Sequence, residues 1–107
     1  MRLYPTAISF GRSPIEDTTI MGQYHLRKGS QVVVFLAGLH RDPKIWTDPE
    51  RFDPERFAQD AGEQNARYTY IPFGAGPNLC IGRDLALMEA TLIVAAVTST
   101  CNLDPVI

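Results

Sequence analysis

The residue best suited to chemistry in this chain is Cys80, which lies between a glycine- and proline-rich loop and an apolar segment. We call residues 73–80 the cysteine loop; a helix is expected to follow it, from about Gly82 to Thr98. A cysteine just ahead of a helix faces unpaired backbone N–H groups and the positive end of the helix dipole. Both features favour the thiolate, which is the form of cysteine that binds metals.

Small residues surround this cysteine. Glycines at 74, 76 and 82 remove side chains, so that a flat macrocycle could approach the backbone closely. Phe73 is expected to cover the sulfur and exclude water. A dry site with N–H groups aimed at a sulfur tunes an iron–thiolate bond.

Other uses of the same loop are separated by spacing. A phosphate-binding GxxxxGK[ST] loop fails because Arg83-Asp84 stand where Lys and Ser or Thr are needed, and a GxGxxG pattern from Gly74 fails at Leu79. Zinc needs further Cys or His, and the loop has none. On residue types alone, a catalytic cysteine paired with His25 or His40 stays open, as does a structural cysteine in a glycine turn.

Composition narrows the function classes further. The 107 residues carry 10 basic and 12 acidic side chains, a net charge of −2, so no general attraction to nucleic acid is expected. Cys80 and Cys101 form neither a CxxC pair nor a disulfide framework, which suits a reducing, cytoplasmic compartment. The longest apolar segment, residues 85–97, is shorter than the roughly 20 residues of a membrane span, so no membrane segment is expected.

The first half of the chain predicts short antiparallel strands. β-Prone runs occur at 18–21, 24–26 and 31–36, separated by turns at Gly22 and Lys28-Gly29. Such alternation is typical of a small antiparallel sheet. Residues 1–5 are expected to end a helix, because Pro5 cannot continue one.

The segment from residue 40 to residue 57 is expected to be irregular but packed. Prolines at 43, 49 and 54 exclude long regular structure, while Trp46, Phe52 and Phe57 supply large apolar side chains. Residues 58–67 are polar and predict an exposed loop. The helix after the cysteine loop is apolar nearly all round, so we expect it to be buried.

The ten residues from Phe73 to Gly82 match the FxxGxxxCxG haem signature of the cytochrome P450 family at every fixed position. The chain resembles that family over essentially its whole length. The supporting motifs are Arg2-Leu3-Tyr4-Pro5, similar to the end of the ExxR helix, and His40-Arg41-Asp42-Pro43 with Phe52-Asp53-Pro54-Glu55-Arg56-Phe57, similar to the meander and its PERF-type motif. The likeness is greatest to bacterial fatty-acid hydroxylases that are fused to a reductase.

The resemblance implies an α+β piece of the mostly helical cytochrome P450 fold. Its parts are a small antiparallel sheet, an irregular meander, the cysteine loop and one long buried helix. Residues 1–107 would then be the C-terminal haem-binding portion of an incomplete domain, a fragment of a longer chain.

The same resemblance implies haem as cofactor, with Cys80 as the iron ligand whose electron donation favours cleavage of bound O₂. The expected haem contacts are Phe73, Gly74, Gly76, Asn78, Cys80, Ile81, Gly82 and Arg12. Asn78 stands where the family usually has Arg or His toward a propionate. Ala7, Ile8 and Ser9 fall where the family lines its substrate pocket, with ordinary strand packing as the alternative.

Arg2 and Arg56 match the two arginines of the family's structural Glu-Arg-Arg cluster. The Glu would lie two residues before Met1. Two buried arginines without that carboxylate lose the partner that makes burial tolerable. The resemblance therefore implies either a substitute acid or a looser cluster.

The implied parent is a haem-thiolate monooxygenase that inserts one atom of O₂ into a lipophilic substrate, using electrons from a reductase or a ferredoxin. The family's oxygen-activating threonine and distal haem wall are outside this chain, so the chain alone is expected to be inactive. Two alternatives stay open: a non-enzymatic haem-binding fragment, and a haem-free remnant.

Overall fold

The computed structural model describes residues 1–58 and 68–104 of the chain. Two compact units are present, Met1–Pro72 and Phe73–Ile107, and each is described by itself. Most of the predicted polar loop at 58–67 lies outside the described residues. Residues 1–5 form no helix, so the predicted helix end is wrong; the backbone there is held by side-chain contacts instead.

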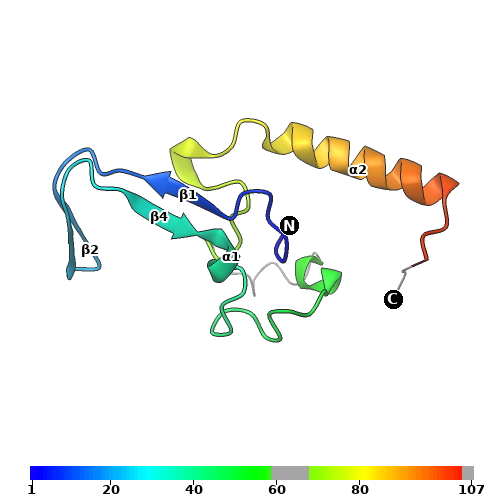
Figure 1. Ribbon diagram of the computed structural model, residues 1–107, viewed down its shortest axis with the longest axis horizontal. Helices are drawn as coiled ribbons and strands as arrows, with labels where there is room; N and C mark the ends of the chain where they lie inside the picture. The colour runs from blue at the N-terminus through cyan, green and yellow to red at the C-terminus, as the bar shows by residue number, and fades with distance from the viewer. Residues whose placement is uncertain (59–67, 105–107) are drawn as a thin grey trace. The chain divides into compact units, whose positions relative to one another are not determined.

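Strands β1 (Ser9–Arg12) and β4 (Val32–Phe35) form the first antiparallel ladder, in which the four residues of each strand pair one to one. One further bond, from the Ala37 N–H to the Ile8 carbonyl at 3.2 Å, extends this ladder. The valines of β4 suit a strand because their branched side chains pack well on a pleated surface. Figure 1 shows the two strands side by side.

Strands β2 (Thr18–Ile20) and β3 (Tyr24–Leu26) form a separate hairpin. Met21 and Gly22 turn the chain with φ values of 54° and 71°, in the left-handed region. The predicted antiparallel strands are confirmed, but they make two two-stranded sheets. Pro14 lies between β1 and β2 and has no N–H to donate, so the first ladder cannot run on into the second.

Two short helical turns accompany the predicted irregular segment of residues 40–57, one directly ahead of it and one at its end. Helix α1 (Leu36–Leu39) follows β4 directly, and the 3₁₀ turn η1 (Pro54–Phe57) closes the segment. Asp53 caps η1 by accepting the Glu55 N–H at 3.1 Å, and Pro54 occupies the first position, where a missing N–H costs nothing. The sequence does not predict α1, because its first residue, Leu36, continues a β-prone run.

The core of the first unit is small. Its buried residues are Arg2, Leu36, His40 and Trp46. The Trp46 indole N–H donates to the Leu39 carbonyl at 3.2 Å, which satisfies the one polar atom of its side chain. Phe57 and Tyr70 pack beside it, with 4.8 Å between their ring centroids.

Phe52 does not join this core, contrary to the prediction. Its side chain is 82% exposed and lies at the edge of a cavity of about 230 Å³ that Tyr4 and Phe57 also line. The reason is local: Asp53 turns the chain into η1, so that Phe57, on the far side of this turn, packs against Tyr70 instead.

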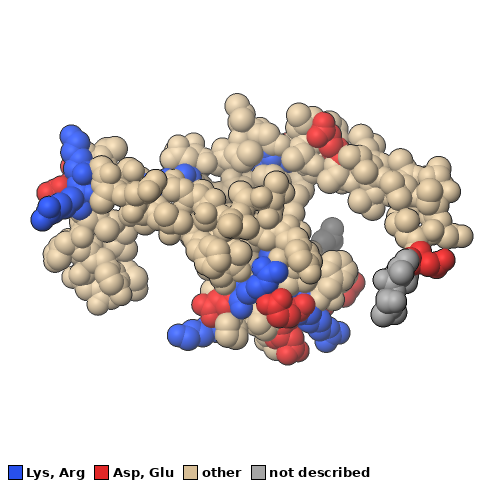
Figure 2. All heavy atoms as spheres, in the orientation of Figure 1, with Lys and Arg blue, Asp and Glu red and all other residues tan. Residues whose placement is uncertain are grey.

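The second unit consists of the cysteine loop, with a 3₁₀ turn η3 (Gly76–Asn78), and the 18-residue helix α2 (Arg83–Thr100). The helix is confirmed, but no residue of α2 is buried, which corrects the predicted burial. A helix that is apolar on all sides needs several neighbours to cover it, and this unit offers one loop and a tail. On the face shown in Figure 2, α2 carries very few charged side chains. None of the helices in the described part of the chain is long and apolar enough to cross a membrane.

Candidate functional site

Backbone hydrogen bonds close the cysteine loop on itself. The Cys80 N–H donates to the Phe73 carbonyl at 2.9 Å, and the Leu79 N–H donates to the Gly76 carbonyl at 3.1 Å. Gly74 and Gly76 have φ values of 79° and 71°, which residues with a Cβ rarely adopt. The two glycines are therefore required by the shape of the loop.

The thiol of Cys80 lies beside the start of α2. Cys80 is free and exposed, and a Cβ added to Gly82, the N-cap residue, would lie 3.9 Å from its Sγ. The Arg83 N–H donates to the Cys80 carbonyl at 3.3 Å, which begins the helix. The sulfur thus lies near the N-terminal end of α2, where backbone N–H groups and the helix dipole favour negative charge.

The surroundings of Cys80 fit a haem group. Leu79 and Ile81 are also exposed, and a Cβ on Gly76 would meet nothing within 4 Å, so this side of the loop is open. Across residues 1–58 and 68–104 there is no group of three or more His, Cys, Asp or Glu side chains that could hold a metal ion. A metal bound at this thiol must bring further ligands of its own, as haem iron does with its ring nitrogens.

Water exclusion at the sulfur is not provided by the described chain. Phe73 contributes its carbonyl to the loop, while Cys80 stays exposed. The predicted shielding by the Phe73 ring stays a prediction, as does the contact of Asn78, an exposed residue at the end of η3, with a propionate.

The other predicted site residues lie in the first unit. Arg12 is half-buried at the end of β1, with its guanidinium carbon 4.4 Å from the centre of the Phe10 ring. Ala7 and Ile8 are exposed, and Ser9 is half-buried at the start of β1. Because the two units are described separately, a site shared by these residues and Cys80 stays a prediction.

The imidazoles that a catalytic cysteine would need are occupied within the first unit. His25 shares a hydrogen bond of 2.9 Å with Thr19 across the hairpin, and His40 Nε2 accepts the Ile71 N–H at 3.2 Å. This arrangement gives no support to a Cys–His catalytic pair.

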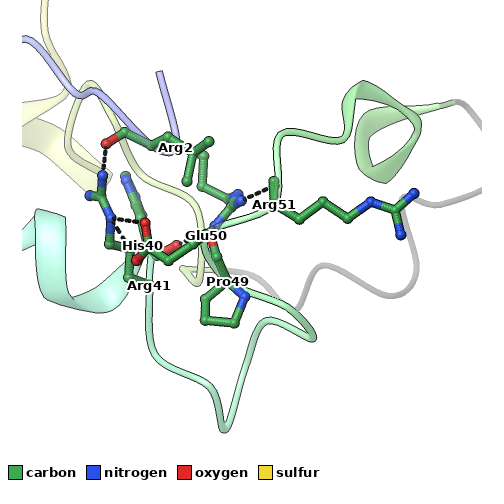
Figure 3. Close-up of polar contacts among 7 residues, drawn as sticks. Arg2, His40, Arg41, Pro49, Glu50 and Arg51 are labelled. Atoms are coloured by element: carbon green, nitrogen blue, oxygen red, sulfur yellow. Dashed lines mark hydrogen bonds and ion pairs between the residues drawn. The ribbon is translucent and has the colours of Figure 1, made fainter.

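Arg2 is the centre of a polar cluster that holds together the irregular segment of residues 40–57, called the meander from here on (Figure 3). Its Nη1 donates to the His40 carbonyl at 2.9 Å and to the Pro49 carbonyl at 2.5 Å, and its Nη2 donates to the Arg51 carbonyl at 2.9 Å. Burial is the largest cause that lowers the pKa of Arg2. Three backbone carbonyls of the meander, which are not paired in a β-sheet, thus accept hydrogen bonds from this guanidinium.

Arg56 and Arg41 complete the cluster from the meander side. The Arg56 Nη2 donates to the Asp48 carbonyl at 3.2 Å, and its Nε lies 3.9 Å from the Asp53 carboxylate. The Arg41 Nη2 donates to the Leu3 carbonyl. Carbonyl oxygens, rather than a substitute acid, take the hydrogen bonds that are described for Arg2, and the looser cluster stays a prediction.

Two residues of the cluster could not be assigned a contact from the sequence. His40 is fully buried beside Tyr70, with 5.2 Å between their ring centroids, and Tyr70 also packs on Phe57. The signal that could have found Tyr70 is an aromatic residue next to the apolar Ile71, three positions ahead of the cysteine loop.

Known proteins resemble this chain over nearly its whole length. The family model for cytochrome P450 matches residues 1–106. Thromboxane-A synthase of Rattus norvegicus is 42% identical over 97 residues, which covers 91% of this chain and 18% of that protein. Cytochrome P450 4V2 of Homo sapiens is 40% identical over 97 residues, with the same coverage. A crystal structure of a mutant cytochrome P450DA heme domain aligns with a TM-score of 0.89 and 34% identity, covering 97% of this chain and 24% of that one.

The chain therefore belongs to the cytochrome P450 family. It spans about a fifth of the length of the curated relatives it matches. The α+β fold of a cytochrome P450 haem domain and haem as the cofactor are confirmed by the family match and the structural neighbours. The finer likeness to bacterial fatty-acid hydroxylases stays a prediction.

Proposed function

We propose that residues 1–107 are the C-terminal haem-binding portion of a cytochrome P450 monooxygenase domain, with Cys80 as the axial ligand of the iron. The observation that carries the proposal is the free, exposed thiol of Cys80 at the N-terminal end of α2, beside glycines that leave its outer side open. The match of the chain to the family supports the same assignment.

Each residue of the loop has a role that its own chemistry suits. The bond from the Cys80 N–H to the Phe73 carbonyl fixes the backbone that presents the sulfur. Gly74, Gly76 and Gly82 keep the open side free of side chains, and Ile81, fully exposed, would pack on the macrocycle. Asn78, a neutral amide, and Arg12, a guanidinium, would bind the propionates. The hydrogen bonds of Arg12 would be the stronger ones, because its side chain is charged.

When bound, haem would supply the activation of O₂ for insertion of one oxygen atom into a lipophilic substrate. Ala7, Ile8 and Ser9 would line part of the substrate pocket. The redox partner would be a reductase or a ferredoxin, and the location cytoplasmic. Arg2 and Arg56 would act as structural residues that hold the meander.

The proposal is tested by haem reconstitution of the chain followed by a carbon monoxide difference spectrum of the reduced protein. The unchanged chain should give the red-shifted Soret band of a thiolate-ligated haem, and Cys80→Ala should lose that band. Cys101→Ala is the matched control, because it removes an exposed thiol at the other end of α2 and should keep the band. A thiolate-type band that persists in Cys80→Ala would refute the assignment.

Turnover tests the expectation that this chain alone binds haem without hydroxylating a substrate. With a reductase and a fatty acid or another lipophilic substrate, the reconstituted chain should show no hydroxylation, since the oxygen-activating residues of the family lie outside it. No uptake of haem at all would favour a haem-free remnant.

A further inference from the structure

His40 is the most completely buried polar residue of the described chain, with no exposed surface. Both of its backbone groups are used: its N–H donates to the Leu36 carbonyl at 2.8 Å, and its carbonyl accepts Arg2 Nη1 at 2.9 Å. The ring packs against Tyr70. The two backbone bonds and the ring contact with Tyr70 together fix the position of the imidazole.

The ring nitrogen Nε2 of His40 accepts the backbone N–H of Ile71 at 3.2 Å, across 31 positions of sequence. Pro72, the next residue, has no N–H. Ile71 is thus the last backbone donor before Phe73, whose carbonyl accepts the Cys80 N–H. The imidazole holds the backbone at the point where the chain leads into the cysteine loop.

This hydrogen bond requires a neutral ring. Because Nε2 accepts, the proton of the neutral imidazole must be on Nδ1, which is buried and has no hydrogen-bond partner among the described residues. A second proton would have to sit on Nε2 and would face the Ile71 N–H, placing two donors against each other. Protonation and the His40–Ile71 bond are mutually exclusive.

The groups that face the ring do not favour an imidazolium. Burial lowers the pKa of His40, and so do the positive charges of Arg2, the amino group of Met1 and Arg41, in that order. Burial raises the pKa of the neighbouring Tyr70, which therefore stays uncharged. Once formed, an imidazolium here would be poorly solvated and would be driven to leave its site.

We propose that His40 is a proton-sensitive anchor of the cysteine loop: the neutral ring holds Ile71 in place, and acid releases it. The anchor deepens the proposed function, because the segment that it holds leads to the haem ligand. Its effect on haem rests on that function, whereas the His40–Ile71 bond itself does not.

Amide hydrogen exchange of the full chain, followed by NMR between about pH 8 and pH 5, tests the anchor directly. The protection factor of the Ile71 amide should fall by about tenfold or more on acidification, as expected for loss of one hydrogen bond. The amide of Gly29, which donates to the Pro14 carbonyl at 2.9 Å, serves as internal reference and should keep its protection. Equal behaviour of both amides over this range would overturn the proposal.

One substitution and one tautomer measurement sharpen the test. His40→Gln places an amide oxygen, which does not titrate, near the position of Nε2, and should keep Ile71 protected in acid. His25→Gln changes the exposed histidine of the hairpin and should leave the pH dependence of Ile71 as in the unchanged chain. Should His40→Gln not fold, ¹⁵N shifts of the His40 ring in the unchanged chain decide: an Nε2–H tautomer would overturn the proposal.

The haem readout distinguishes the two claims. In the reconstituted chain, the thiolate-type Soret band should be lost on acidification together with Ile71 protection, and His40→Gln should retain it to lower pH. Titration of Ile71 without haem uptake would leave the anchor standing and refute the proposed function. A thiolate band together with pH-independent protection of the Ile71 amide would support the proposed function and refute the anchor.

Discussion

The two units of this chain differ in what they bury. Among residues 1–58 and 68–104, the four buried residues, Arg2, Leu36, His40 and Trp46, all belong to the first unit, whereas α2 of the second unit has none. Cys80, the predicted haem ligand, is in the unit of which no described residue is buried. In this piece of the family's fold, the residues that pack into a core and the predicted haem ligand therefore belong to different units.

The difference follows from the kinds of contact available to each unit. The first unit combines an antiparallel ladder, an aromatic cluster and the carbonyl contacts of Arg2, which join residues far apart in sequence. The described hydrogen bonds of the second unit are local, within the cysteine loop and along α2. A helix gains most of its stability from tertiary packing, so α2 depends on surfaces beyond its own unit.

The largest expected effect that would separate the units is loss of the central indole. Trp46→Ala should lower the free energy of unfolding by about 3–5 kcal/mol, since it empties the core of the first unit. Urea unfolding measures this change. The matched control is Leu92→Ala, which shortens a side chain of α2 that is 63% exposed. It should change the free energy of unfolding by no more than about 0.5 kcal/mol. Comparable losses in both variants would mean that the helix is packed after all.

Removal of the guanidinium at residue 2 should have the next largest effect. Arg2→Met keeps much of the side-chain volume but leaves three carbonyls without their donor, and we expect a loss of about 3 kcal/mol. Urea unfolding should show no such loss for Arg83→Met, an exposed arginine at the start of α2. An unchanged midpoint in Arg2→Met would show that water replaces the guanidinium without penalty.

A smaller effect should come from acid. The pKa of His40 is lowered from its ordinary value of 6.5, so the folded chain binds fewer protons there than the unfolded chain. The resulting stability of the first unit is complete above this ordinary value and decreases as the pH falls through it. Chemical unfolding at several pH values should show this slope, and His40→Gln should flatten it. A slope that is the same in both proteins would assign it to other groups.

The smallest effect on stability, but a clear effect on surface, is expected from polar residues on α2. Leu92 and Ile93 are each 63% exposed, and exposed apolar patches bind hydrophobic dyes and promote association. The double variant Leu92→Gln, Ile93→Gln should reduce dye fluorescence and aggregation while leaving the unfolding midpoint nearly unchanged. No dye binding by the unchanged chain would contradict the exposed helix.

How much could be read from the sequence depends on the range of the interactions. The strands β2, β3 and β4, the turn at Gly29, the start of α2 and the glycine turns before Cys80 follow from local preferences, and these predictions are confirmed in kind. Strand β1 is not among the predicted strand runs. Local reasoning failed where a partner is distant. The apolar pattern of α2 predicts a buried helix, but a pattern states what a helix needs and not whether its neighbours are present.

In the meander, the sequence failed to predict contacts that are present, again because the partners are distant in sequence. Its prolines exclude regular structure, which is confirmed, yet nothing in the spacing indicates that its carbonyls converge on Arg2 or that His40 binds Ile71. The sequence does not distinguish Phe52 from Phe57, since both are phenylalanines of the same segment. The turn that begins at Asp53 places Phe57 against Tyr70 and leaves Phe52 exposed. The roles of Cys80 and its loop toward haem remain predictions from the family signature.

The reach of the Arg2 side chain has a consequence for the order of folding. Its three acceptors lie 38, 47 and 49 positions away, so large loops must close before any of these bonds can form. The meander has no ladder that could form ahead of that event and hold its carbonyls in readiness. We therefore expect the meander to become ordered late, when the chain has closed far enough for Arg2 to reach carbonyls as many as 49 positions away.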